Sequence, residues 1–86
     1  MTSKYFVAIE DERMSKNPLY AIDATGEGWT DMPGQVGGLT EAEKDALVAI
    51  ILQHGIAYDV VEEQRAVNPC IRRRIAGTVE IIRTVF

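Results

Sequence analysis

The residues best suited to nucleophilic or acid–base chemistry in this 86-residue chain are its single histidine, His54, and its single cysteine, Cys70. A cysteine nucleophile usually needs a histidine base beside it, and nothing in the sequence brings these two together. His54 falls in the last turn of a predicted helix, where a cation can cap the end carbonyls. Cys70 is expected to be structural, although a helix beginning at Asn68-Pro69 would favour its thiolate. With no catalytic motif, the chain is predicted not to be an enzyme.

No residue pattern predicts a metal or cofactor site. The spacings typical of zinc and calcium ligands are absent. The carboxylates that follow His54, which are Asp59, Glu62 and Glu63, do not have the spacing of metal ligands either. Gly34, Gly37 and Gly38 precede the predicted helix, but they match neither the nucleotide P-loop nor the dinucleotide fingerprint. Glu41 and Glu43 would also repel a phosphate at that helix start. We expect a flexible connection there, no metal ion and no cofactor.

The ionisable residues are unevenly distributed along the chain. Residues 1–63 carry twelve acids and four bases, whereas residues 64–86 carry five arginines and one acid, for a formal net charge of −4. Nucleic-acid binding needs several phosphate contacts, which this balance disfavours. We therefore expect the Arg72-Arg73-Arg74 patch to pair with Glu62, Glu63 or Glu80, within the chain or between subunits. Docking onto an acidic partner and binding to nucleic acid are the less favoured alternatives.

The acids of residues 1–63 form the predicted partner-binding surface. Trp29, in the same part of the chain, adds a large apolar side chain that can anchor a partner. We predict that this surface meets a basic, nucleic-acid-handling protein, as a DNA mimic or inhibitor of the phage or mobile-element type does. The alternatives are that the acids are simply solvated and that Trp29 covers the core. The predicted contact residues are Glu10, Asp11, Glu12, Glu27, Trp29, Asp31, Glu62 and Glu63.

One long helix, over residues 40–54, organises the predicted fold. Thr40 and Glu43 have the spacing of a capping box. Gly55 suits the left-handed residue that ends a helix, and Ile56 would then contact Ile51 in a Schellman motif. The core-facing side of such a helix should be apolar and its outer side polar.

Residues 46–52 of that helix are instead apolar all round, so its outer side needs a second cover. Three covers are possible: the long glycine-rich loop predicted over Thr25–Gly38, which contains Trp29, the C-terminal segment, or another subunit. Because exposed aliphatic side chains favour association, we predict a homodimer. The predicted self-association residues are Val48, Leu52, Arg72 and Arg73.

Short apolar segments predict four strands, at Tyr5–Ile9, Leu19–Ala24, Ala57–Glu62 and Thr78–Phe86. In the second strand, Asp23 alternates with Leu19 and Ala21, which predicts that this set faces solvent. In the third, Tyr58 and Val60 should face away from Asp59 and Val61. The last strand is the most apolar and is expected inside the sheet.

The segment 69–76 is ambiguous. Asn68-Pro69 is typical of a helix start, and Ile71 and Ile75 are four residues apart, so a short second helix is favoured. A strand over Cys70–Ile75 is the alternative.

The predicted fold class is α+β: a single domain of residues 1–86, with about four strands and the long helix on one sheet face. No apolar run is long enough for a membrane span, no signal peptide is recognisable, and one cysteine fits a reducing compartment, so we expect a cytoplasmic protein. The predicted function is a small acidic interaction protein with a protein partner. The alternatives are a homodimeric ligand-binding protein or enzyme with a site between subunits, and a structural assembly subunit.

Overall fold

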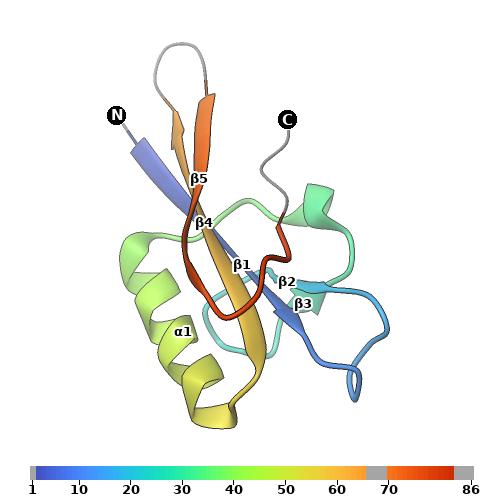
Figure 1. The fold of residues 1–86 in the computed structure, drawn as a ribbon. Helices are drawn as coiled ribbons and strands as arrows, with labels where there is room; N and C mark the ends of the chain where they lie inside the picture. Colours follow the sequence, from blue (N-terminus) through green and yellow to red (C-terminus); the bar gives the residue numbers. More distant parts are fainter. Residues whose placement is uncertain (1, 66–69, 83–86) are drawn as a thin grey trace.

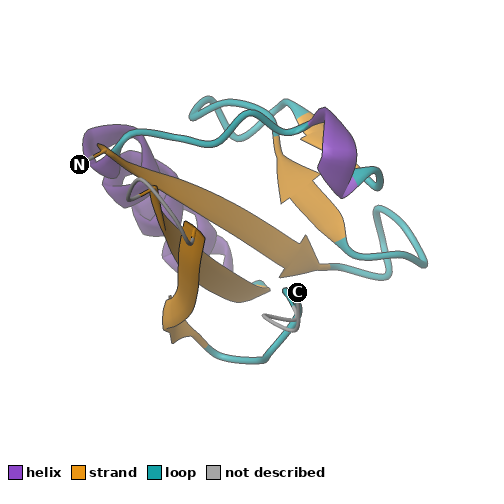
Figure 2. Cartoon of the chain, turned by 90° about the horizontal axis from the view of Figure 1, so that it is seen from above, coloured by secondary structure: helices purple, strands orange, loops and turns teal. Residues whose placement is uncertain are grey.

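The computed structural model describes residues 2–65 and 70–82, which form a five-stranded antiparallel sheet with one long helix against it (Figure 1). Seen from above, the helix lies along one side of the long strands (Figure 2). The strand order is β3-β2-β1-β4-β5. This arrangement confirms the predicted α+β class. The elements are β1 (Thr2–Glu10), β2 (Leu19–Ala21), β3 (Trp29–Thr30), the 3-10 helix η1 (Pro33–Gln35), α1 (Glu41–His54), β4 (Ala57–Arg65) and β5 (Cys70–Gly77).

Both ends of α1 form as predicted. The Glu43 amide donates to the Thr40 hydroxyl at 3.2 Å, and the Thr40 amide donates to the Glu43 carboxylate at 3.0 Å. At the other end Gly55 adopts a left-handed φ of +64°. The amide of Gly55 donates to Leu52 and that of Ile56 to Ile51, which is the hydrogen-bond pattern of a Schellman motif. Local sequence therefore sets both boundaries of the helix.

Replacing Thr40 by alanine should lower the free energy of unfolding by about 1 kcal/mol, because the Glu43 amide loses its capping acceptor. Thr40→Ser keeps a hydroxyl at the same position and should stay close to the wild type. Urea denaturation of the two variants, followed by circular dichroism, measures the difference. Equal stability of the alanine and serine variants would contradict a capping role.

The core lies between α1 and one face of the sheet. Strands β1 and β4 pair along their whole lengths, from Thr2↔Arg65 to Glu10↔Ala57, so alternate residues point to the helix. Burial of each such aliphatic side chain contributes roughly 1.5–3 kcal/mol. The buried cluster consists of Val7, Ile9, Ala21, Leu39, Leu47, Ile51, Tyr58 and Val60. The predicted separation of Tyr58 and Val60 from Asp59 and Val61 is confirmed.

The predicted orientation of the second strand is wrong. Ala21 is buried in the core, Leu19 packs against it, and Ile22 is 46% exposed. The strand ends at Ala21, so Asp23 belongs to the following turn, where its carboxylate accepts hydrogen bonds from the amide and hydroxyl of Thr25. A turn residue does not report which side of the strand faces solvent.

The short second helix predicted over residues 69–76 is also wrong, because Cys70–Gly77 is a strand, β5, paired antiparallel with β4. The residues that suggested a helix start, Asn68 and Pro69, lie outside the described residues. Register partners are Val60↔Ala76 and Val61↔Arg74, so Ile75 is the extra residue of a β-bulge. With β3, which pairs with β2 from within the long loop, the sheet has five strands instead of about four.

The C-terminal strand predicted over Thr78–Phe86 does not form in its described part. Residues 78–82 have no strand conformation, and they lie against the sheet face opposite α1. Residues 83–86 of that prediction lie outside the described residues. Within the part of the chain that the structure describes, no helix combines the length and the apolar character that a membrane crossing requires.

Candidate interaction surface and cavity

Three acids of β4 each pair with an arginine of β5. The residues Asp59 and Glu63 are fully buried, and Glu62 is 8% exposed. The expected pairing of Arg72 and Arg73 with Glu63 and Glu62 is therefore confirmed, whereas the partner of Arg74 was not predicted. The closest N–O distances are 2.6 Å for Asp59–Arg74, 3.4 Å for Glu62–Arg73 and 2.5 Å for Glu63–Arg72.

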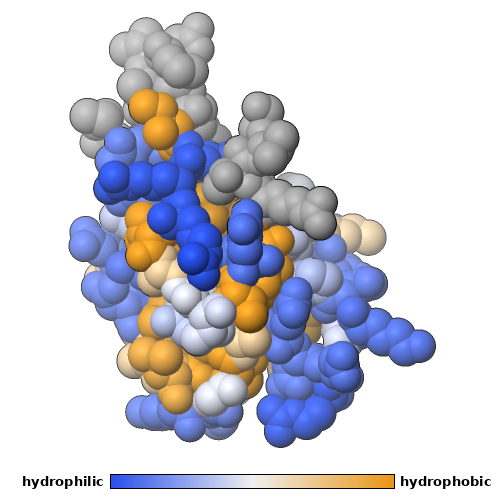
Figure 3. All heavy atoms as spheres, in the orientation of Figure 1, coloured by the Kyte–Doolittle hydropathy of each residue, from blue (hydrophilic) through white to orange (hydrophobic). Residues whose placement is uncertain are grey.

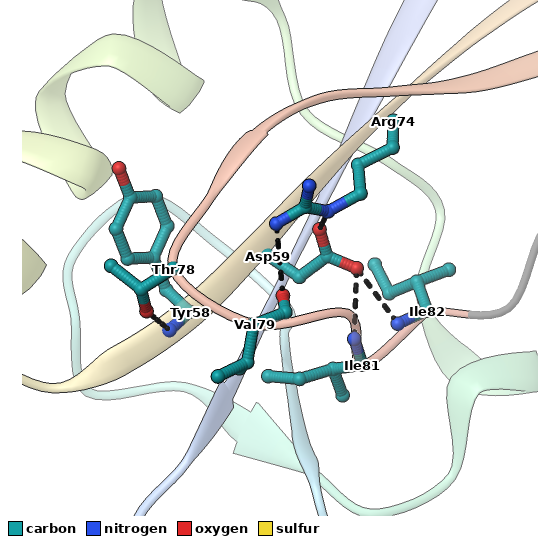
Figure 4. A network of polar contacts seen from close by, with 7 residues as sticks. All are labelled: Tyr58, Asp59, Arg74, Thr78, Val79, Ile81 and Ile82. Atoms are coloured by element: carbon teal, nitrogen blue, oxygen red, sulfur yellow. Dashed lines mark hydrogen bonds and ion pairs between the residues drawn. The ribbon is translucent and has the colours of Figure 1, made fainter.

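Asp59 is the centre of a network that fastens the C-terminal segment to the sheet (Figure 4). One carboxylate oxygen accepts from Arg74 Nε at 2.6 Å. The other accepts from the backbone amides of Ile81 and Ile82 at 3.0 and 2.9 Å. Arg74 also donates to the carbonyl of Val79 at 3.2 Å. A buried carboxylate is stable only when its lone pairs are satisfied in this way, so we assign Asp59 a structural role.

Glu62 lies on the helix side of the sheet. Its Oε2 accepts a hydrogen bond from the Tyr5 hydroxyl at 3.0 Å. This bond to the carboxylate raises the pKa of Tyr5, and burial raises it further. The Lys44 ammonium lies 5.0 Å from the centre of the Tyr5 ring. These contacts join β1, β4 and α1 on the helix side of the sheet.

His54 and Cys70 lie at opposite ends of the sheet. His54 ends α1 just before β4 begins, whereas Cys70 pairs with Arg65 at the far end of β4. Nine residues of strand separate those ends by roughly 25–30 Å, so the two residues cannot form a thiol–imidazole pair. The side chain of Cys70 lies outside the described residues. Among the described residues, no three His, Cys, Asp or Glu side chains are grouped to hold a metal ion.

Several of the predicted contact acids gather at one end of the sheet. Strands β1 and β3 run in the same direction, so Glu10 and Asp31 leave the sheet at the same end. Glu80 is also there, since the amide of the preceding residue donates to Tyr58 near the start of β4. The negative C-terminal pole of α1 points to this end as well. We call this group the acidic end: Glu10, Asp11, Glu12, Asp31 and Glu80.

The carboxylates of the acidic end differ in their surroundings. Asp11 pairs with Arg13 at 3.0 Å, and this contact lowers the pKa of Asp11. The other four acids are exposed, and their carboxylates form no hydrogen bond or ion pair with any residue in the described ranges. Glu27, also exposed, lies at the opposite end of the β2–β3 hairpin. The predicted contact residues therefore do not form one surface, because Glu27 lies elsewhere and Glu62 and Glu63 are buried. Glu80 belongs to the acidic end but was not among the predicted contact residues.

Trp29 covers part of the core, as the alternative interpretation expected. It is half-buried, packs against the core cluster, and donates from Nε1 to the carbonyl of Gly26 at 2.8 Å. Its remaining surface lines a groove of about 280 Å³ together with Met14, Ile50 and His54. A role for Trp29 in partner binding stays a prediction.

The outer side of α1 is partly apolar. Val48 is half-buried and packs against the core, whereas Leu52 is 58% exposed and Ala49 is exposed. Figure 3 shows apolar surface over the lower part of this helix. The described chain therefore leaves Leu52 without the second cover that we expected. The homodimer stays a prediction, in which Arg72 and Arg73 would contribute while bound to their own acids.

A cavity of about 630 Å³ lies on the sheet face opposite α1. Its floor comes from β1, β4 and β5, and its walls come from the loop around η1 and from residues 81–82. Sequence analysis missed this cavity because the residues that line it are distant in the chain. They are Lys4, Phe6, Tyr20, Pro33, Gly34, Val36, Gly37, Val61, Glu63, Arg72, Ile81 and Ile82.

Comparison with known proteins adds no relative to this description: no family model matches the sequence, and no curated protein or solved structure is significantly similar to it.

Proposed function

We propose that the chain is a small, non-enzymatic interaction protein whose acidic end binds a basic surface of a partner protein. The observation that carries the proposal is the division of its charges. The arginines of β5 are paired with acids of β4, whereas Glu10, Glu12, Asp31 and Glu80 are exposed and have no described partner. Inhibition or modulation of a nucleic-acid-handling protein is the specific form that we propose.

The position of these carboxylates favours binding over simple solvation. Exposed, unpaired acids on one end of a small domain produce a negative potential that attracts a basic partner and orients the approach. The C-terminal pole of α1 adds partial negative charge at the same end. At the opposite end of the sheet, in contrast, the acids of β4 are paired with Arg72 and Arg73.

The test begins with capture of a partner from native lysate by tagged protein at low salt, and continues with the purified partner in calorimetric titrations. Neutralising three acids of the acidic end should weaken binding at least tenfold and reduce its dependence on salt, because attractive contacts are removed. The control removes three charges elsewhere and should weaken binding less than threefold. The two variants are Glu10→Gln/Glu12→Gln/Asp31→Asn and, as the control, Glu27→Gln/Glu41→Gln/Asp45→Asn.

Equal affinity of the two variants for the partner would exclude the acidic end as the binding surface. A partner that is itself acidic, or one that is retained unchanged at high salt, would also contradict the proposal.

A further inference from the structure

The cavity opposite α1 has a charged end and an apolar end. Lys4 of β1, Glu63 of β4 and Arg72 of β5 are register partners, so they form one row across the three strands. In the next row on this face, about 6.6 Å along the strands, Phe6 and Val61 line the cavity, whereas the third member, Arg74, does not. We call the first of these the charged row. The floor of the cavity thus changes from ionic to apolar within one strand repeat.

The charged row is built into the fold. Glu63 is fully buried and binds Arg72 Nε at 2.5 Å, and the Arg72 guanidinium lies 5.8 Å from the centre of the Phe6 ring. Lys4 is half-buried, and its stem lies against Gly38, where an added Cβ would be 3.0 Å from the Cβ of Lys4. The backbone of Gly38 has a φ of +92°, which favours glycine at this position.

Among the described residues that line the cavity, the formal charges of this row sum to one positive charge. Lys4, Glu63 and Arg72 are the ionisable groups among its described lining, apart from the Tyr20 phenol. The side-chain ammonium of Lys4 forms no hydrogen bond or ion pair with any residue in the described ranges, in contrast to the two paired side chains beside it. An ammonium that lines a mostly apolar cavity without an ion-pair partner is stabilised when it meets an anion. The rest of the lining, including Phe6 and Ile82, is mostly apolar.

We propose that this cavity binds a small molecule with one carboxylate and an apolar body. The carboxylate would bind Lys4 at the charged row, and the apolar body would lie on Phe6, Val61 and the isoleucines of the C-terminal segment. A volume of about 630 Å³ is typical of small-molecule sites, which combine apolar walls with a few polar groups. The site is distinct from the acidic end and does not depend on the interaction proposed above.

The test compares octanoate with 1-octanol and octylamine, which share an apolar body and differ in charge. Octanoate should bind at least tenfold more tightly than octanol, and octylamine should bind most weakly. Amide shifts in nitrogen–proton spectra should change at Phe6, Val61 and Ile82, rather than at Trp29 and Ile50 beside the smaller groove. Lack of saturation at millimolar octanoate, or a preference for octanol, would overturn the proposal.

Lys4→Met keeps most of the side-chain stem and removes the charge, so it should weaken octanoate binding about tenfold and leave octanol binding unchanged. Lys16→Met makes the same change on an exposed turn and serves as the control. Val36→Trp adds bulk to the cavity wall and should weaken both ligands. Equal octanoate affinity of the two methionine variants would overturn the assignment of Lys4. The acidic-end variant should retain octanoate binding, which separates the two proposals.

Discussion

Asp59→Ala is expected to lower the free energy of unfolding by about 3–5 kcal/mol, which is the usual result of removing one partner of a buried ion pair. The substitution leaves the Arg74 guanidinium without its counterion, and it leaves the amides of Ile81 and Ile82 without their acceptor. For a domain of this size, such a loss corresponds to a fall in Tm of roughly 15–30 °C. Thermal and urea denaturation would measure it.

Asp45→Ala provides the control for Asp59→Ala. Asp45 also binds a cation at 2.5 Å, in this case Lys44, but its side chain is 65% exposed. An exposed pair contributes up to about 1 kcal/mol, so this variant should remain near the wild type. If Asp59→Ala is as stable as Asp45→Ala, the network in Figure 4 does not hold the C-terminal segment in place.

Gly77→Ala is expected to lower the free energy of unfolding by about 3 kcal/mol or more. Gly77 has a φ of +136°, which side-chain-bearing residues rarely adopt. A Cβ there would also lie 2.7 Å from the carbonyl oxygen of Tyr58 and 2.8 Å from the Cα of Asp59. Because both contacts are to backbone atoms, relief requires β4 and β5 to separate locally.

Gly37→Ala is the matched control, since an added Cβ at Gly37 meets no atom within 4 Å and its φ is not positive. Urea denaturation of the two variants should therefore give clearly different midpoints. Similar midpoints would mean that the end of β5 moves away from β4 at little cost.

The parts of the fold that depend on local sequence were predicted well. The helix boundaries follow from Thr40, Glu43 and Gly55, which all act within one or two turns of the backbone. The strands around Tyr5–Ile9 and Ala57–Glu62 were found because their apolar residues are buried on at least one face. In contrast, β3 is two residues long and too short for any periodicity to be visible.

The error at β5 has a non-local cause. Ile71 and Ile75 have helical spacing, but the three arginines between them pair with buried carboxylates of β4. These ion pairs form only when β4 and β5 lie side by side in the folded sheet. Tertiary contacts of this kind override a weak helical pattern. The segment 78–82 was misjudged for a related reason. The amides of Thr78 and Val79 both donate to the Tyr58 carbonyl, so no strand ladder continues. The amides of Ile81 and Ile82 donate to the Asp59 side chain.

In the candidate sites, too, residues that are adjacent in sequence could be predicted to lie together, whereas residues that only the folded sheet brings together could not. Glu10, Asp11 and Glu12 are adjacent in sequence and stay together on the surface. Bringing Asp31 and Glu80 to them depends on the strand order. The charged row joins residues from β1, β4 and β5, so neither composition nor spacing could indicate the cavity.

The position of β5 at the edge of the sheet has a consequence for aggregation. An eight-residue edge strand is a template on which strands of other copies can add. Here an added strand would have to desolvate Arg73, whose side chain is 67% exposed. The bulge at Ile75 would also interrupt the regular hydrogen bonding to that strand. Both features oppose edge-to-edge growth into fibrils. The arginines that neutralise the buried acids of β4 therefore also protect the open side of the sheet.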